Sequence, residues 1–91
     1  MILGKNVFLN TGAIIEHDCK IGDHSQIGPG VMLSGGVQIK RGCFIGIGSK
    51  INQNITIGEN TIIGSGSVVI KNVKKNSIYA GVPAKQIGVL E

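Results

Sequence analysis

Residues 15–38 read IEHDCK IGDHSQ IGPGVM LSGGVQ, four successive hexads that each open on a branched aliphatic residue. The same aliphatic column runs from Leu3 to Val69 without insertion or gap. A period of six fits neither an α-helix nor an ordinary hairpin sheet, so it indicates a repeat architecture. Four positions after each aliphatic stands a small or β-branched residue, such as Ser25 or Val31. Even offsets along a strand share one face, so both columns are expected to point inward.

Glycine marks two further positions of the hexad. Twelve of the 15 glycines stand at its second or its fourth position. Glycine tolerates positive φ, so we expect a turn at the second position, and both columns are interpreted as part of the corner geometry. Strand and corner then alternate with sides of equal length, which predicts a triangular coil of three hexads. The two sets are Gly4, Gly22, Gly28, Gly46, Gly58 and Gly64 at the second position, and Gly12, Gly30, Gly36, Gly42, Gly48 and Gly66 at the fourth.

These columns predict an all-β fold, a parallel β-helix of hexapeptide repeats. We expect about four triangular coils over residues 1–74 and a short C-terminal cap and tail over residues 75–91. Successive coils would stack about 4.8 Å apart, because each coil hydrogen-bonds to the next. No stretch shows the i, i+3, i+4 apolar spacing of an amphipathic helix. A chain of 91 residues with this pattern forms one thin domain.

Composition bounds the classes of function. The net charge of +4 suits an anionic ligand. Nucleic acid is not an expected partner, because only three aromatic residues could stack on bases and no basic stripe accompanies them. Cys19 and Cys43 belong to the inward column on different faces, so we expect buried free thiols rather than a disulfide. With no signal peptide or membrane-spanning run in the sequence, a cytoplasmic protein without a membrane partner is expected.

The sixth position of the hexad points outward and differs between the three faces. Two faces carry apolar rows, each interrupted by one polar residue, and the third face is polar. Exposed apolar rows on adjacent faces predict self-association, and a homotrimer is the simplest closed arrangement of triangular prisms. The rows are Phe8, Gln26, Phe44 and Ile62, then Ile14, Met32, Lys50 and Val68, and on the polar face Lys20, Gln38, Thr56 and Lys74.

His17 is the main candidate for chemistry. It stands at a corner between Glu16 and Asp18, and an imidazole beside a carboxylate is held in one tautomer and made more basic, as a general base requires. An exposed turn histidine without a function is the competing interpretation. The coil arithmetic favours chemistry, because Gly35 stands one coil further on, where bare backbone leaves room for a ligand and an unobstructed N–H. His24 is interpreted as a surface turn residue.

A second column follows one edge of the predicted prism. Pro29, Ile47 and Ser65 stand one coil apart, and a further step of the same length reaches Pro83. A straight track of this kind suits a long, extended ligand. Several lysines gather near its end, where they could meet phosphates, and a solvated basic tail is the alternative interpretation. They are Lys71, Lys74, Lys75 and Lys85.

The chain resembles the hexapeptide-repeat acyltransferases, and within them the NeuD/PglD-like sugar and sugar-nucleotide acetyltransferases. The resemblance is carried by the hexads, by Glu16-His17-Asp18-Cys19, by residues 33–36 (LSGG) and by residues 81–85 (GVPAK). It implies a left-handed β-helix and an acetyl-CoA-dependent acetyltransferase that acts on an amino or hydroxyl group of a sugar or sugar nucleotide. It does not extend to the N-terminal βαβ domain with which those relatives hold the sugar nucleotide.

The resemblance also implies roles for single residues. His17 would be the general base and Asp18 would raise its basicity, while the acceptor attacks the thioester directly. Acetyl-CoA, the expected co-substrate, would lie between adjacent subunits of the trimer. Asn10 would help to hold the acceptor or the histidine. The residues expected to bind acetyl-CoA are Gln26, which stands where relatives often carry a second histidine, and Gly35, Ile47, Ser65, Pro83 and Lys85.

Three other interpretations stay open. Serine or another small molecule could be the acetyl acceptor, since other groups of the superfamily share the prism. The chain could instead be a non-catalytic, trimeric β-helix remnant. A γ-type carbonic anhydrase would need three converging imidazoles, and the two histidines lie on different faces, so no metal is expected.

Overall fold

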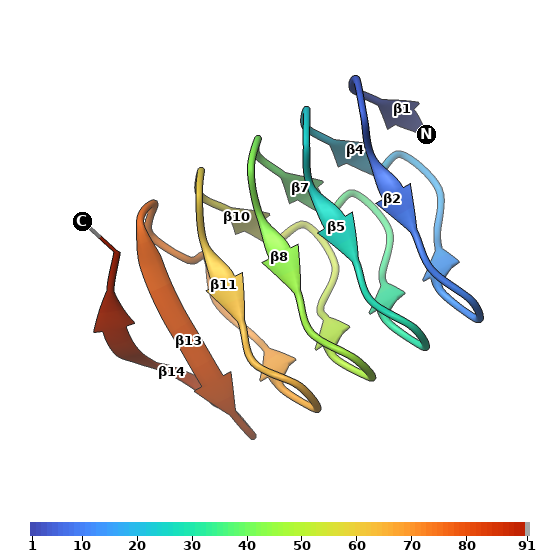
Figure 1. Ribbon diagram of the computed structural model, residues 1–91. Coiled ribbons are helices and arrows are strands. Elements are labelled where there is room, and N and C mark those ends of the chain that lie inside the picture. The colour runs from blue at the N-terminus through green and yellow to red at the C-terminus, as the bar shows by residue number, and fades with distance from the viewer. Residues whose placement is uncertain (91) are drawn as a thin grey trace.

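The computed structural model describes residues 1–90 and shows four stacked triangular coils (Figure 1). Each coil contains three strands of two residues, and equivalent strands of successive coils pair in parallel to form one sheet on each face. The first face has β1 (Ile2–Leu3), β4 (Lys20–Ile21), β7 (Gln38–Ile39) and β10 (Thr56–Ile57). The second has β2 (Phe8–Leu9), β5 (Gln26–Ile27), β8 (Phe44–Ile45) and β11 (Ile62–Ile63). The third has β3 (Ile14–Ile15), β6 (Met32–Leu33), β9 (Lys50–Ile51) and β12 (Val68–Val69).

Strand pairing within the four coils keeps a constant register. Ile21 pairs with Ile39 and Ile27 pairs with Ile45, so each aliphatic residue lies over its counterpart one coil away. Backbone hydrogen bonds tie the coils together, such as the bond of 2.7 Å from the Gly22 N–H to the Ile39 carbonyl. The predicted all-β, left-handed parallel β-helix of about four triangular coils is confirmed.

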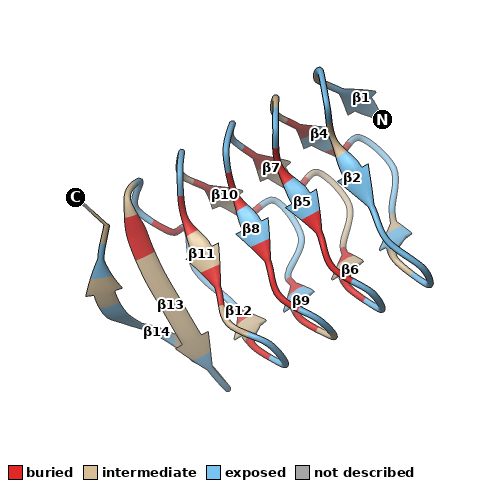
Figure 2. Ribbon diagram, in the orientation of Figure 1, coloured by how far each residue is buried: buried red, intermediate tan, exposed pale blue. Residues whose placement is uncertain are grey.

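The two inward columns form a slim core (Figure 2). Every buried side-chain nitrogen or oxygen in residues 1–90 has a hydrogen-bond partner. The Ser25 hydroxyl, for example, donates to the Lys40 carbonyl at 2.8 Å and accepts the Cys43 N–H at 3.1 Å. Cys19 and Cys43 are buried free thiols, as predicted, and burial raises the pKa of the Cys43 thiol. The small column therefore links neighbouring coils as well as filling the corners.

The two glycine columns serve different purposes, and the prediction of a turn with positive φ at the second position is wrong. Within the hexads, positive φ is confined to the fourth position, where Gly48 has a φ of 69° and Asp18 one of 60°. Glycine is required at the second position for a different reason, because the backbones of neighbouring coils approach each other closely there. A Cβ on Gly22 would lie 2.5 Å from the backbone nitrogen of Arg41. The absent side chain thus lets successive corners stack.

The two ends of the prism are built differently. At the first coil, Leu3 and Leu9 are 43% and 41% exposed, whereas Ile21 in the second coil is 2% exposed. After the fourth coil, β13 (Ser77–Gly81) extends the second face parallel to β11, and β14 (Ala84–Val89) folds back antiparallel to it (Figure 1). None of residues 1–90 forms a helix long and apolar enough to cross a membrane.

The register changes at the corner that follows β12. Val73 pairs with Ile57, and these two residues are two positions closer in the sequence than the paired residues of the preceding coils. The pairing of β13 with β11 keeps this shorter separation. The predicted step from Ser65 to Pro83 therefore does not continue the stack, and that placement of Pro83 is wrong. Lys74 does not complete the polar row of the first face either. Because of the shorter spacing, Val73 rather than a later residue lies beside Ile57 of β10.

Candidate functional site

His17 and Asp18 form a close pair at the corner between β3 and β4. Their facing atoms, His17 Nδ1 and Asp18 Oδ2, lie 3.2 Å apart. The two side chains are 81% and 86% exposed, so the pair stands on the surface of the single chain. Because Nδ1 faces the carboxylate, Nε2 is the ring nitrogen available for proton transfer to a ligand.

Gly35 lies directly against the His17 ring. A Cβ on Gly35 would lie 2.8 Å from Cε1 and 3.0 Å from Nε2 of the imidazole. The Gly36 N–H donates to the His17 carbonyl at 3.0 Å, which fixes the two corners relative to each other. The predicted juxtaposition is confirmed with one correction, because the space beside Gly35 holds the imidazole itself rather than room for a ligand. The Gly35 N–H has no acceptor within residues 1–90.

Asn10 does not reach His17. Its side-chain amide donates to the Ile27 carbonyl at 3.0 Å and so ties the first coil to the second at the corner between β2 and β3. The suggestion that Asn10 holds the histidine is therefore wrong for a single chain. Its contact with an acceptor stays a prediction.

The residues predicted to bind acetyl-CoA lie on other parts of the prism. Gln26 is exposed on the second face, between Phe8 and Phe44 of the neighbouring strands. Ile47 and Ser65 lie on the edge between the second and third faces, whereas His17 lies on the edge between the third and first. One chain therefore keeps the predicted base apart from the predicted track for the co-substrate.

The hairpin of β13 and β14 carries the last two predicted residues. Pro83 and Lys85 are both exposed there. The Gly81 N–H donates to the buried Ser67 hydroxyl at 3.2 Å, which anchors the hairpin at the corner after β11. Since Ser65 belongs to that same corner, the hairpin lies at the end of the track even though the register has changed.

His24 lies in an exposed turn, with its Nδ1 at 3.1 Å from Asn6 Nδ2. This arrangement agrees with its interpretation as a surface turn residue. Among residues 1–90, no group of three or more His, Cys, Asp or Glu side chains could hold a metal ion.

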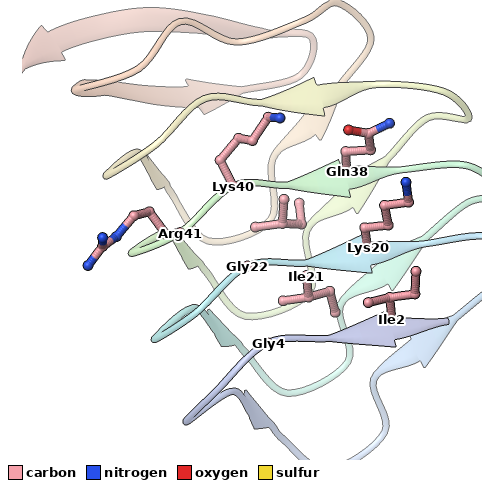
Figure 3. Close-up of a pocket in the computed structure, with 9 residues that line it drawn as sticks. Ile2, Gly4, Lys20, Ile21, Gly22, Gln38, Lys40 and Arg41 are labelled. Carbon is pink, nitrogen blue, oxygen red and sulfur yellow. The ribbon is translucent and has the colours of Figure 1, made fainter.

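Two hollows, one beside the His17 corner and one over the first face, were not expected from the sequence. The smaller, of about 250 Å³, is lined by residues that include Ile2, Asp18 and Lys20. The larger, of about 290 Å³, lies on the first face over β1, β4 and β7 (Figure 3). The sequence did place Lys20 beside Gln38 in the outward row of the first face. This pairing alone does not predict that the flanking side chains line a hollow.

Comparison with known proteins gives consistent matches. The family model of the bacterial transferase hexapeptide (six repeats) matches residues 1–35 and 36–71. A single-residue variant of perosamine N-acetyltransferase from Caulobacter crescentus, in complex with CoA and GDP-perosamine, is 37% identical over 94% of this chain, with a TM-score of 0.91. Serine acetyltransferase from Brucella abortus strain S19, in complex with coenzyme A, is 36% identical over 99% of this chain, with a TM-score of 0.92.

A third similar structure is the acetyltransferase domain of PglB from Neisseria gonorrhoeae FA1090, in complex with acetyl coenzyme A. It is 31% identical over 93% of this chain, with a TM-score of 0.90. The present chain spans 41%, 40% and 44% of the perosamine, serine and PglB proteins, respectively. The similarity therefore concerns the β-helix and less than half of each of these proteins.

Proposed function

This chain belongs to the bacterial transferase hexapeptide family, and from that premise we propose that it transfers acetyl from acetyl-CoA to an amino or hydroxyl group of a sugar or sugar nucleotide. The observation that carries the proposal is the His17–Asp18 pair held against the bare backbone of Gly35. A base with an oriented tautomer and an unpaired N–H beside it are two of the groups that acyl transfer uses. The similar perosamine and PglB structures contain CoA or acetyl coenzyme A.

In the proposed reaction, His17 Nε2 takes a proton from the acceptor as the acceptor attacks the thioester carbonyl. The new C–N or C–O bond forms, the C–S bond breaks, and the proton passes from the imidazole to the departing thiolate. Asp18 keeps the Nδ1 proton in place and stabilises the imidazolium while it carries the proton. The Gly35 N–H donates to the carbonyl oxygen as negative charge develops on it.

The proposed site is completed by a second copy of the chain, in a homotrimer. Phe8, Phe44 and Ile14 are exposed on two adjacent faces, which suit packing of one face on another. In the proposed trimer, the His17 edge of one copy lies beside the Ile47 edge of its neighbour. Acetyl-CoA would then lie between copies and contact the remaining predicted residues, which are Gln26, Ser65, Pro83 and Lys85, with Asn10 near the acceptor. We place this enzyme in the cytoplasm.

Serine, or another small hydroxyl compound, is the second candidate acceptor. The serine acetyltransferase from Brucella abortus is as similar to this chain as the perosamine enzyme is, with 36% and 37% identity. The β-helix therefore does not distinguish an amino sugar from a hydroxyl amino acid. A non-catalytic trimer is the remaining alternative, and it predicts no binding of acetyl-CoA.

The test is an acetyl transfer assay that follows release of the CoA thiol. Acetyl-CoA is supplied with a panel of amino-sugar nucleotides, free amino sugars and serine. We expect release with one acceptor class and a loss of at least about a hundredfold in the His17→Ala variant. Asn6→Ala, which removes the partner of the other histidine, is the matched control and should keep full activity. Undiminished activity of His17→Ala would refute the role of His17 as the general base. Calorimetry that shows no heat of acetyl-CoA binding would refute the proposal that the chain is an acetyltransferase.

A further inference from the structure

The larger hollow on the first face is lined by an unusual set of side chains (Figure 3). Lys20 rises from β4, Gln38 from β7, and Lys40 and Arg41 follow β7 at the next corner. Ile2 contributes an apolar side chain at one end. Three cations thus line a space of about 290 Å³, and none of the residues that line it is acidic. We call it the basic hollow.

These cations are not engaged by acidic side chains of the same chain. Within residues 1–90, no carboxylate lies within 4.0 Å of the charged nitrogens of Lys20, Lys40 or Arg41. Two acidic residues belong to the neighbouring corners. Asp23 accepts the Lys5 N–H at 2.8 Å, and Glu59 stands one coil beyond Arg41, where its carbonyl accepts the Asn76 N–H. Like charges kept together without acidic partners repel one another, and an anionic ligand would relieve that repulsion.

We infer that the basic hollow binds a phosphate or diphosphate group. A guanidinium presents paired N–H donors to phosphate oxygens, and lysine supplies a flexible point charge. The Gln38 amide adds a neutral donor on the same face. Whole drug-sized ligands occupy sites of about 300–1,000 Å³, so a hollow at the bottom of that range suits the anionic part of a ligand rather than all of it.

The position of the basic hollow indicates that the bound phosphate belongs to the acetyl acceptor rather than to acetyl-CoA. The smaller hollow shares Ile2 and Lys20 with it and is also lined by Asp18, the partner of His17. A ligand could therefore reach from the cations to the base along one face. That face carries no apolar outward row and stays open in the proposed trimer. This assignment rests on the proposed function and narrows the acceptor to a nucleotide-linked or phosphorylated sugar.

The experiment is a calorimetric titration of the full chain with inorganic pyrophosphate at low salt. Charge-assisted hydrogen bonds at exposed positions are modest, so we expect about tenfold weaker binding in the Lys20→Gln/Lys40→Gln double variant. The control is Lys5→Gln/Lys50→Gln, which removes the same charge from two exposed lysines that do not line the basic hollow and should bind as the wild type does. Absence of pyrophosphate binding, or equal weakening in both double variants, would overturn the anion site. All four substituted side chains are exposed, so thermal unfolding should not change.

Competition then identifies the source of the phosphate. A nucleoside diphosphate should displace pyrophosphate from the wild type at a lower concentration than CoA, which also carries a diphosphate but is proposed to lie on the Ile47 edge. Displacement by CoA alone would overturn the assignment to the acceptor. Acetyl-CoA binding, measured separately, should be equal in the wild type and the Lys20→Gln/Lys40→Gln variant. Failure of the proposed function is distinct, since it would appear as absent acetyl-CoA binding in the wild type, whatever happens with pyrophosphate.

Discussion

Replacing Gly35 by alanine tests the His17 corner with a single methyl group. The new Cβ would lie 2.8 Å from Cε1 of the His17 ring, while ordinary van der Waals contact begins at 3.4 Å. The exposed imidazole must therefore retreat by about 0.6 Å or rotate, because overlap of this size is strongly repulsive. A displacement of about 1 Å in a reacting group can cost about a hundredfold in rate. We therefore expect Gly35→Ala to lower kcat/KM by roughly ten- to a hundredfold.

The fold should be unaffected by the same change. Gly35 is not among the residues with positive φ, and the atoms that the methyl group meets belong to an exposed, movable side chain. The free energy of unfolding should change by no more than about 0.5 kcal/mol. Kinetics and urea unfolding of Gly35→Ala are compared with those of His17→Ala and the double variant. In the absence of the imidazole, the methyl group should cause no further loss. A loss of similar size on top of His17→Ala would refute the reasoning.

Three further outcomes are expected. Gly22→Ala should lower the free energy of unfolding by about 3 kcal/mol, because the new Cβ would meet rigid backbone. Gly48→Ala should lower it by only about 1 kcal/mol, because its Cβ would enter open space and only the positive φ is unfavourable. Urea unfolding measures both, and the reverse order would contradict the distinction between the two glycine columns. Ser25→Ala should cost about 2 kcal/mol in the same assay, because one buried and one part-buried hydrogen bond to the backbone are lost; an unchanged midpoint would contradict this. Phe44→Asp should convert the proposed trimer to monomer in light scattering, while Thr56→Asp on the polar face should not; a Phe44→Asp trimer would place the interface elsewhere.

The period of the sequence was sufficient to predict most of the fold. Every strand pair in the four coils obeys a single spacing, so counting along the chain places any residue on a face and next to its neighbours. The contact between His17 and Gly35 followed from that count alone. Residues Ile47 and Ser65 were likewise placed on their common edge correctly.

Features that depend on local backbone and side-chain conformation could not be predicted by counting along the repeat. Glycine is equally permitted where φ is positive and where two backbones touch, so the sequence could not separate Gly48 from Gly22. The corner after β12 loses two residues, yet Val73 still fits the small-residue column by count, and this misplaced Pro83. The basic hollow depends on how the side chains of Lys40 and Arg41 lie at a corner, which a repeat pattern does not encode.

The proposed active site between copies can be tested most directly by mixing two inactive variants. His17→Ala removes the proposed base, and Ser65→Trp blocks the exposed edge along which acetyl-CoA is proposed to lie. Each variant alone should be inactive and trimeric. If every site combines the His17 edge of one copy with the Ser65 edge of its neighbour, co-refolding equal amounts should restore about a quarter of the wild-type acetyl transfer. Mixed trimers as inactive as the two parent variants would contradict a site formed between copies.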